Sequence, residues 1–307
     1  MKVWSLLIVT IFVVNLVRAQ DVFVKKEMKP SIPWAVFDWS PYYILKGPQL
    51  GEGRLDRLKK IIAERLPLYQ FVDVYADMPR AMELWGLGKN ICIGSAIKTP
   101  EREKLAYFTA WSFQVPHEYL IVTGKPEVFQ RMPEAPSLKE VLSQKKLKGV
   151  FTENRSYGFI IDALIRTAVK PPSSVKQVRS SEGYLSVLKM IEKGRYDYTI
   201  EYEFVVWDFN QRIFPSKPLL SKPLKETYPS MVIYVACTKN EWGKKVVQQI
   251  DEALQKAATS KEYQSAVESW TVPDSLRKNR KALEDFYHRR AQGPWNTVVS
   301  GGSPSDQ

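Results

Sequence analysis

Residues 91–109 read ICIGSAIKTPEREKLAYFT, and this stretch places a charged loop directly after a short apolar run. The run at 91–94 is typical of a strand that is buried on both faces of a sheet. Arg102 is therefore expected near the carboxyl end of a strand, where open α/β sheets bind ligands. A guanidinium holds a carboxylate through two parallel hydrogen bonds, which lysine does not reproduce. The alternative is a solvated arginine on a surface loop.

The segments before this stretch alternate between strand-like and helix-like patterns. Strands are predicted at 34–39 and 71–75, and helices at 51–66 and 78–87. The first helix carries its apolar residues on one face, as an amphipathic helix does. With the strand at 91–94, this order gives one complete α/β half.

A second half repeats the alternation. Strands are predicted at 119–123, 148–151, 175–178, 196–202 and 231–237. A capping box, Ser137 with Glu140, predicts one helix start. A helix after Gly158 is expected to present one apolar face, formed by Phe159, Ile160, Ala163 and Leu164. Further helices are predicted at 182–193, 242–258 and 261–270.

Two such halves predict an α/β protein with two lobes, each a mainly parallel sheet flanked by helices, and a ligand cleft between the lobes. The first lobe is expected to comprise residues 30–113 and 231–272, and the second residues 114–230. Residues 273–307 are expected to form a basic helix and a disordered tail.

The N-terminus has the layout of a secretory signal peptide. Lys2 precedes an apolar run from 5 to 17, and Ala19 ends a segment typical of a cleavage site. We therefore expect removal of residues 1–19 on export, with no lipid anchor because no cysteine follows the run. A retained membrane helix is the alternative.

Charge and cysteine content narrow the classes of function. The net charge is +12, but basic residues are interleaved with acidic ones, and no aromatic-basic motif of a nucleic-acid module occurs. We expect no nucleic-acid partner and no metal or cofactor, since two histidines and two distant cysteines do not make a typical zinc site. Cys92 and Cys237 lie in apolar strand-like runs, which favours two buried thiols, although export also permits a disulfide.

Three motifs in order along the chain resemble those of a known family. They are Thr99-Pro100-Glu101-Arg102 with the following aromatic-Phe-Thr segment, Gly194-Arg195-Tyr196-Asp197, and Trp39-Ser40-Pro41-Tyr42. Over residues 30–272 the chain resembles the type II periplasmic solute-binding proteins, in the branch that serves polar amino acid transport (bacterial extracellular solute-binding protein family 3).

The resemblance implies a two-lobed periplasmic-binding-protein-like fold and a monomer in the periplasm. It implies capture of a small polar solute with a carboxylate for an ABC transporter permease or a membrane sensor. Arg102 would grip the carboxylate, Trp39 would stack on the ligand, and Met78 would face it. Further ligand-binding candidates are Gly94, Ser95, Asn154, Arg155 and Ser156, the last three at a helix start that favours an anion.

Each of these residues also has a structural interpretation. Trp39 is a candidate core residue, Met78 is compatible with ordinary helix packing, and Ser156 is compatible with an N-cap.

The sequence departs from the family pattern at one position. Where the family has an aspartate for the ammonium group of the ligand, Tyr202 stands here, next to Glu201. Successive strand residues face opposite sides, so Glu201 points away from the cleft unless a bulge intervenes. This departure favours a carboxylate-bearing solute over an ordinary amino acid, and both residues are candidate ligand contacts.

Other functions remain possible on this fold. One is an enzyme such as a periplasmic dehydratase, with Glu153, Glu201 or Glu203 as acid or base. Another is a ligandless domain associated with the cell wall or with signalling. We predict a binding protein and not an enzyme, because no nucleophile–histidine–acid arrangement is evident.

Overall fold

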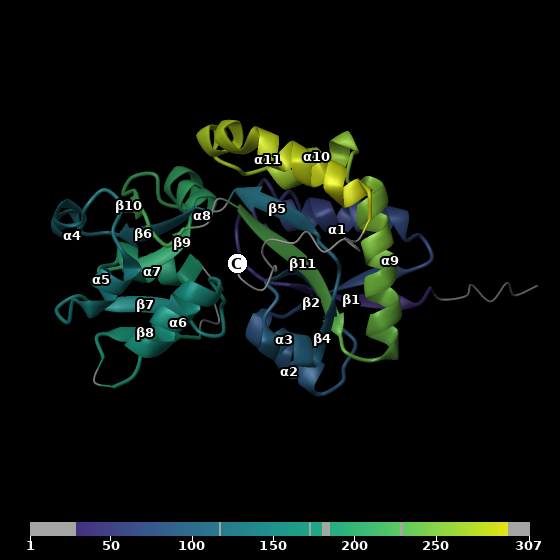
Figure 1. The fold of residues 1–307 in the computed structure, drawn as a ribbon, viewed down its shortest axis with the longest axis horizontal. Helices are drawn as coiled ribbons and strands as arrows, with labels where there is room; N and C mark the ends of the chain where they lie inside the picture. Colours follow the sequence, from purple (N-terminus) through teal and green to yellow (C-terminus); the bar gives the residue numbers. More distant parts are fainter. Residues whose placement is uncertain (1–28, 117, 172, 180–184, 228–229, 294–307) are drawn as a thin grey trace, which may run out of the picture.

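The computed structural model describes residues 29–293, apart from 117, 172, 180–184 and 228–229. The predicted signal peptide and the end of the predicted tail lie outside the described residues. The chain forms two lobes, seen at the right and left of Figure 1. We call the elements around the larger sheet the first lobe and those around the two smaller sheets the second lobe. The predicted two-lobed α/β fold is confirmed, while the predicted lobe bounds stay a prediction.

Among the described residues, the first lobe holds a six-stranded sheet in the order β2-β1-β3-β11-β4, with β5 also paired to β11. Its strands are β1 (Ser31–Val36), β2 (Gln70–Tyr75), β3 (Cys92–Ala96), β4 (Ala106–Phe108), β5 (Phe113–Pro116) and β11 (Ser230–Thr238). Its helices are α1 (Arg54–Arg65), α2 (Met78–Gly86), α3 (Pro100–Leu105), α9 (Glu241–Ala257), α10 (Lys261–Glu268) and α11 (Pro273–Ala291).

The second lobe, as far as it is described, holds a three-stranded sheet in the order β10-β6-β9 and a β7-β8 pair. Its strands are β6 (Tyr119–Thr123), β7 (Gly149–Thr152), β8 (Val175–Val178), β9 (Thr199–Tyr202) and β10 (Leu220–Pro223). Its helices are α4 (Pro126–Arg131), α5 (Leu138–Ser143), α6 (Phe159–Ala168), α7 (Leu185–Glu192), α8 (Glu203–Asp208) and the π-helix η1 (Phe209–Ile213).

The expectation of a mainly parallel sheet in each lobe was wrong in this detail. β1 runs parallel to β2 and β3, and β7 runs parallel to β8. β11 is antiparallel to β3, β4 and β5, and β6 is antiparallel to β9 and β10. Strand β11 lies between β3 and β4 and also pairs with β5, so its direction makes three pairings of the first sheet antiparallel.

Helix α1 shows how local sequence sets the start of an element near the cleft. The carboxylate of Asp56 accepts hydrogen bonds from the backbone N–H groups of Gly53 and Ile44, at 3.0 and 2.9 Å. A Cβ atom at Gly53 would lie 2.4 Å from the carbonyl oxygen of Tyr42, so only glycine allows this close approach. The helix then buries Leu55, Leu58, Ile61 and Ile62, as its periodicity predicts.

Cys92 and Cys237 form a disulfide, so the preference for two buried thiols was wrong. They lie 145 residues apart in the sequence, but β3 and β11 are antiparallel neighbours in which these residues are directly paired. Their Cα atoms are 4.1 Å apart. The sequence pattern correctly placed both residues in buried strands but did not show which strands are adjacent.

Two local predictions in the second lobe were also wrong. Helix α6 buries Ile161 and Ile165, whereas Phe159 is 72% exposed. The helix is apolar on most sides, so its periodicity did not identify the buried face.

At α5, Ser137 makes no capping box, because Glu226 accepts hydrogen bonds from the Ser137 hydroxyl and the Leu138 N–H. A carboxylate that is distant in the sequence therefore accepts the hydrogen bonds of the donors at that helix start.

The predicted C-terminal helix, α11, runs along the top of the molecule in Figure 1, from α8 of the second lobe toward α9 of the first. Near its end, the buried Arg290 donates hydrogen bonds to the carbonyl oxygens of Trp111 and Asp251 and pairs with the Asp251 carboxylate. Near its start, the Ser275 hydroxyl donates to the Glu203 carboxylate. The helix therefore contacts both lobes.

Where the chain is described, no helix combines the length and apolar character that a membrane crossing requires.

Candidate functional site

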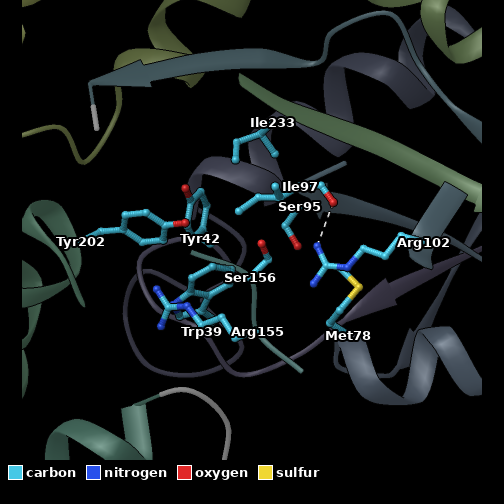
Figure 2. A pocket seen from close by; sticks show the side chains of 10 residues that line it. All are labelled: Trp39, Tyr42, Met78, Ser95, Ile97, Arg102, Arg155, Ser156, Tyr202 and Ile233. Atoms are coloured by element: carbon cyan, nitrogen blue, oxygen red, sulfur yellow. Dashed lines mark hydrogen bonds between the residues drawn. The ribbon is translucent and has the colours of Figure 1, made fainter. Parts of the chain in front are cut away.

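A small cavity lies between the two lobes. Its open space is about 20 Å³, enough for about one water molecule. Figure 2 shows that its walls come from distant parts of the chain. The lining residues are Trp39, Tyr42, Met78, Ser95, Ile97, Arg102, Arg155, Ser156, Tyr202 and Ile233. The structure thus brings together seven residues that the sequence singled out as ligand contacts.

Arg102 projects from α3 into this cavity. Thr99 begins the helix by accepting a hydrogen bond from the Arg102 N–H, so the motif itself fixes the position of the arginine. Its Nη1 donates to the carbonyl oxygen of Ile97 at 2.8 Å, the dashed line in Figure 2. Its Nη2 donates across the cleft to the carbonyl oxygen of Asn154 at 3.1 Å. Arg102 is 5% exposed, and its guanidinium donates to one backbone oxygen of each lobe.

Arg155 pairs with Glu201 inside the second lobe. Nη1 of Arg155 donates to Oε2 of Glu201 over 2.6 Å, and Nη2 donates to Oε1. The two side chains are 5% and 3% exposed. Burial lowers the pKa of Arg155, but Glu201 and Tyr157 outweigh it and hold that pKa well above its usual value. The guanidinium therefore stays charged.

Aromatic rings surround this guanidinium. Its central carbon lies 4.6 Å from the ring centre of Tyr157, 5.0 Å from that of Tyr202 and 5.2 Å from that of Trp39. Such distances are typical of cation–π contacts. Burial raises the pKa of Tyr157 to about 12 and also raises the pKa of Tyr202, so both hydroxyls keep their protons at neutral pH. We call Glu201 and these three aromatic residues the cage.

The loop at 154–158 does not offer the free helix start that was predicted for an anion. Helix α6 begins at Phe159, and Asn154 turns the chain with a φ of 57°. The carboxylate of Asp162 accepts hydrogen bonds from the Ser156 hydroxyl at 2.5 Å and the Tyr157 N–H at 2.7 Å. Asn154 is exposed and contributes its carbonyl oxygen to Arg102. The carboxylate of Asp162 thus occupies two hydrogen-bond donors of this loop that an anion would need.

The remaining predicted residues divide between the cavity and the core. Met78 and Ser95 line the cavity, and so does Tyr202, whereas Glu201 faces Arg155. Gly94 does not line the cavity, and a Cβ atom there would lie 2.8 Å from Cζ2 of the buried Trp34. Sequence reasoning missed Ile97 and Ile233 as lining residues. Tyr42 lies within a motif that had been noticed, so that motif was an available signal.

The acidic residues considered for catalysis are not gathered at the cavity. Glu153 is exposed, and Glu203 accepts a hydrogen bond from Ser275. Glu201 forms an ion pair with Arg155. In the described part of the chain, no group of three or more His, Cys, Asp or Glu residues is placed to hold a metal ion.

The lobes also touch at residues that do not line the cavity. Ser40 of the first lobe donates to the buried carboxylate of Asp208 at 2.8 Å, and Arg212 donates to the Ser40 oxygen at 2.5 Å. At another edge, Arg179 of the second lobe pairs with Glu83 of α2 at 3.1 Å. These contacts, together with Arg102, hold the cleft closed.

Solved structures of solute-binding proteins superpose on this chain. An ancestral arginine-binding protein bound to arginine has 17% identity and a TM-score of 0.61, over 80% of this chain and 100% of that one. The arginine-, lysine-, histidine-binding protein ArtJ of Geobacillus stearothermophilus has 18% identity and a TM-score of 0.59, over 81% and 99%. An arginine-specific periplasmic binding protein of Salmonella typhimurium has 13% identity and a TM-score of 0.59, over 79% and 100%.

No protein-family model matches the sequence, and a comparison with curated proteins gives no match. Likeness at these identities concerns the arrangement of the chain and does not by itself assign an activity. It agrees with the resemblance that the three sequence motifs indicated. The chain therefore has the two-lobed α/β fold of the periplasmic solute-binding proteins.

Proposed function

We propose that this chain is an exported binding protein that captures a small carboxylate-bearing solute between its lobes. The observation that carries the proposal is the position of Arg102. One arm of its guanidinium is held by the Ile97 carbonyl, and the other reaches across the cleft to a backbone oxygen. A ligand carboxylate that replaced this oxygen would join the lobes through the same donor.

Other residues complete the proposed contacts. Ser95 lines the cavity from the first lobe and carries a hydroxyl that can donate to a carboxylate oxygen, whereas Ser156 lines it from the second lobe and donates to Asp162. Trp39 and Met78 supply apolar walls. Asn154, Arg155, Glu201 and Tyr202 shape the second-lobe side, and Gly94 packs behind the first-lobe wall.

Binding would work by hinge closure. The lobes are joined by chain segments that leave β5 and return at β11. Their contacts across the cleft include hydrogen bonds of Ser40 and Arg102 and the packing of Tyr42 against Phe204, whose ring centres are 5.0 Å apart. Opening exposes the site, and closing on a ligand gives a distinct surface that a membrane transporter or sensor recognises. The N-terminal sequence supports export to the periplasm, and the similar structures are binding proteins rather than enzymes.

A thermal-shift screen tests the proposal. Purified protein is mixed with small carboxylates, amino acids and short peptides, because a ligand that binds only the folded state raises the melting temperature. We expect a carboxylate to give a shift that Arg102→Ala abolishes. Arg102→Lys should retain the charge but weaken binding by about tenfold or more, since it lacks the planar fork.

Arg57→Ala is the matched control, because Arg57 lies on α1 of the same lobe and pairs with Glu52 outside the cavity. Full affinity in Arg102→Ala would contradict the carboxylate contact. Mass spectrometry of the ligand after incubation checks for turnover, and chemical conversion would favour an enzyme. A screen without any shift would favour a ligandless relative.

A further inference from the structure

We infer that Arg155 is a tethered cation that occupies the cage, and that the site therefore selects carboxylates without an ammonium or guanidinium group. The selectivity rests on the proposed binding function, whereas the occupation of the cage does not. The cage comprises Glu201, Trp39, Tyr157 and Tyr202, as defined above.

The cage has the chemistry of a site for a flat organic cation. The carboxylate of Glu201 receives both terminal nitrogens of the guanidinium, the bidentate arrangement that suits this group best. Aromatic rings at 4.6–5.2 Å face the same carbon. A free guanidinium or ammonium ligand would need these partners, but a side chain of the protein already uses them.

Neither of the two acids that contact the lining residues Arg155 and Ser156 is left for a ligand cation. Glu201 is paired with Arg155, and Asp162 accepts hydrogen bonds from Ser156 and Tyr157. The lining residues among the described part of the chain include no aspartate or glutamate. Their charged members are Arg102 and Arg155, both cations. An ammonium group closed into this space would lose its water without gaining a carboxylate.

The two lobes build the cage together. Glu201, Tyr157 and Tyr202 belong to the second lobe, whereas Trp39 follows β1 of the first. Arg155 lines the cavity while it fills the cage, as Figure 2 shows for its position beside Trp39. The side chain therefore forms the boundary between the cation site and the remaining space.

The first test compares matched solutes on the unchanged protein by calorimetry. Succinate is paired with aspartate, and propionate with alanine, because each pair differs by one amino group. We expect the carboxylate to bind at least about 100-fold more tightly than its amino counterpart, since a buried cation without a partner is costly. Equal affinity within either pair that binds would overturn the inferred selectivity.

The second test empties the cage with Arg155→Ala and uses methylguanidine as the probe. We expect methylguanidine at millimolar concentration to raise the melting temperature of this variant and to leave that of the unchanged protein unaffected. Arg155→Ala/Glu201→Gln is the matched control, because it has the same space without the charge and should lose most of the gain. This arm needs no knowledge of the natural ligand.

The two arms separate the possible failures. If no carboxylate binds but methylguanidine rescues Arg155→Ala, the proposed function fails and the occupied cage stands. If Arg155→Ala does not fold in buffer, its refolding yield with and without methylguanidine becomes the measurement. A folded variant without any gain, or an unfolded one without any rescue, would overturn the inference that the cage is a cation site.

Discussion

The guanidinium of Arg102 in the first lobe donates a hydrogen bond of 3.1 Å to the carbonyl oxygen of Asn154 in the second. Asn154 presents this oxygen because its backbone lies in the left-handed region, with a φ of 57°. The proposed carboxylate contact therefore also joins the lobes.

Removal of this contact should loosen the closed cleft. A hydrogen bond with a charged donor contributes about 1.5–3 kcal/mol, so Arg102→Ala should shift the protein toward an open form. We expect a larger radius of gyration in small-angle X-ray scattering without any added solute. Arg57→Ala, which removes an exposed pair between Arg57 of α1 and Glu52, should give the scattering of the unchanged protein. Identical curves for both variants would show that other contacts suffice for closure.

The disulfide should stabilise the first lobe substantially. It closes a loop between residues 145 apart, and loss of such a bridge costs about 2–5 kcal/mol. Cys92→Ala/Cys237→Ala should therefore unfold at lower urea concentration, and a reductant should affect the unchanged protein but not this variant. Labelling of two thiols in the unreduced, unfolded protein would contradict the bridge.

Gly94 should matter for packing rather than for ligand contact. Its missing Cβ atom would lie 2.8 Å from Cζ2 of Trp34, whose indole N–H is bonded to the Tyr43 hydroxyl at 2.9 Å. Gly94→Ala should cost about 1–3 kcal/mol of unfolding free energy in urea titrations and leave ligand affinity nearly unchanged. Gly86→Ala, where a Cβ atom meets nothing within 4 Å, is the control. A large loss of affinity with unchanged stability would place Gly94 in the site.

The contact between α11 and the second lobe should respond to pH. Burial raises the pKa of Glu203, although the Ser275 hydroxyl partly opposes this effect. The folded state thus holds the proton more tightly than the unfolded state, so this group lowers stability as pH rises above the ordinary carboxyl range. Glu203→Gln should remove that part of the pH dependence and be more stable than the unchanged protein at neutral pH.

Melting temperatures of Glu203→Gln and the unchanged protein between pH 4 and pH 7 test this expectation. Glu284→Gln removes the same charge from an exposed position of α11 and is the control. A constant difference between Glu203→Gln and the unchanged protein across this range would contradict a raised pKa.

Part of the candidate site could be predicted from local sequence. Arg102 lies in a motif whose Thr99 and Pro100 begin a short helix directly after a buried strand. Ser95 and Trp39 likewise lie at or just beyond strand ends. These positions depend on interactions between residues that are close together in the sequence, so a local sequence pattern is enough to predict them. The alternation of strands and helices could be predicted from the sequence for the same reason.

Other features depend on which distant segments become neighbours. The Cys92–Cys237 bridge required β11 to lie beside β3, and the buried face of α6 depended on what packs against a helix that is apolar on most sides. Neither fact follows from hydrophobic periodicity, which records that a segment is buried but not what covers it.

The sequence by itself determined an alternating α/β chain with an arginine after its third strand, the residue that we propose binds a carboxylate. Only the tertiary structure decided that Arg155, 46 residues from Glu201, fills the cage with its own charge. The physical reason is that the alternation of a strand fixes the faces on which Glu201 and Tyr202 lie. The partner of a buried carboxylate depends instead on which cationic side chain the fold places within hydrogen-bonding distance.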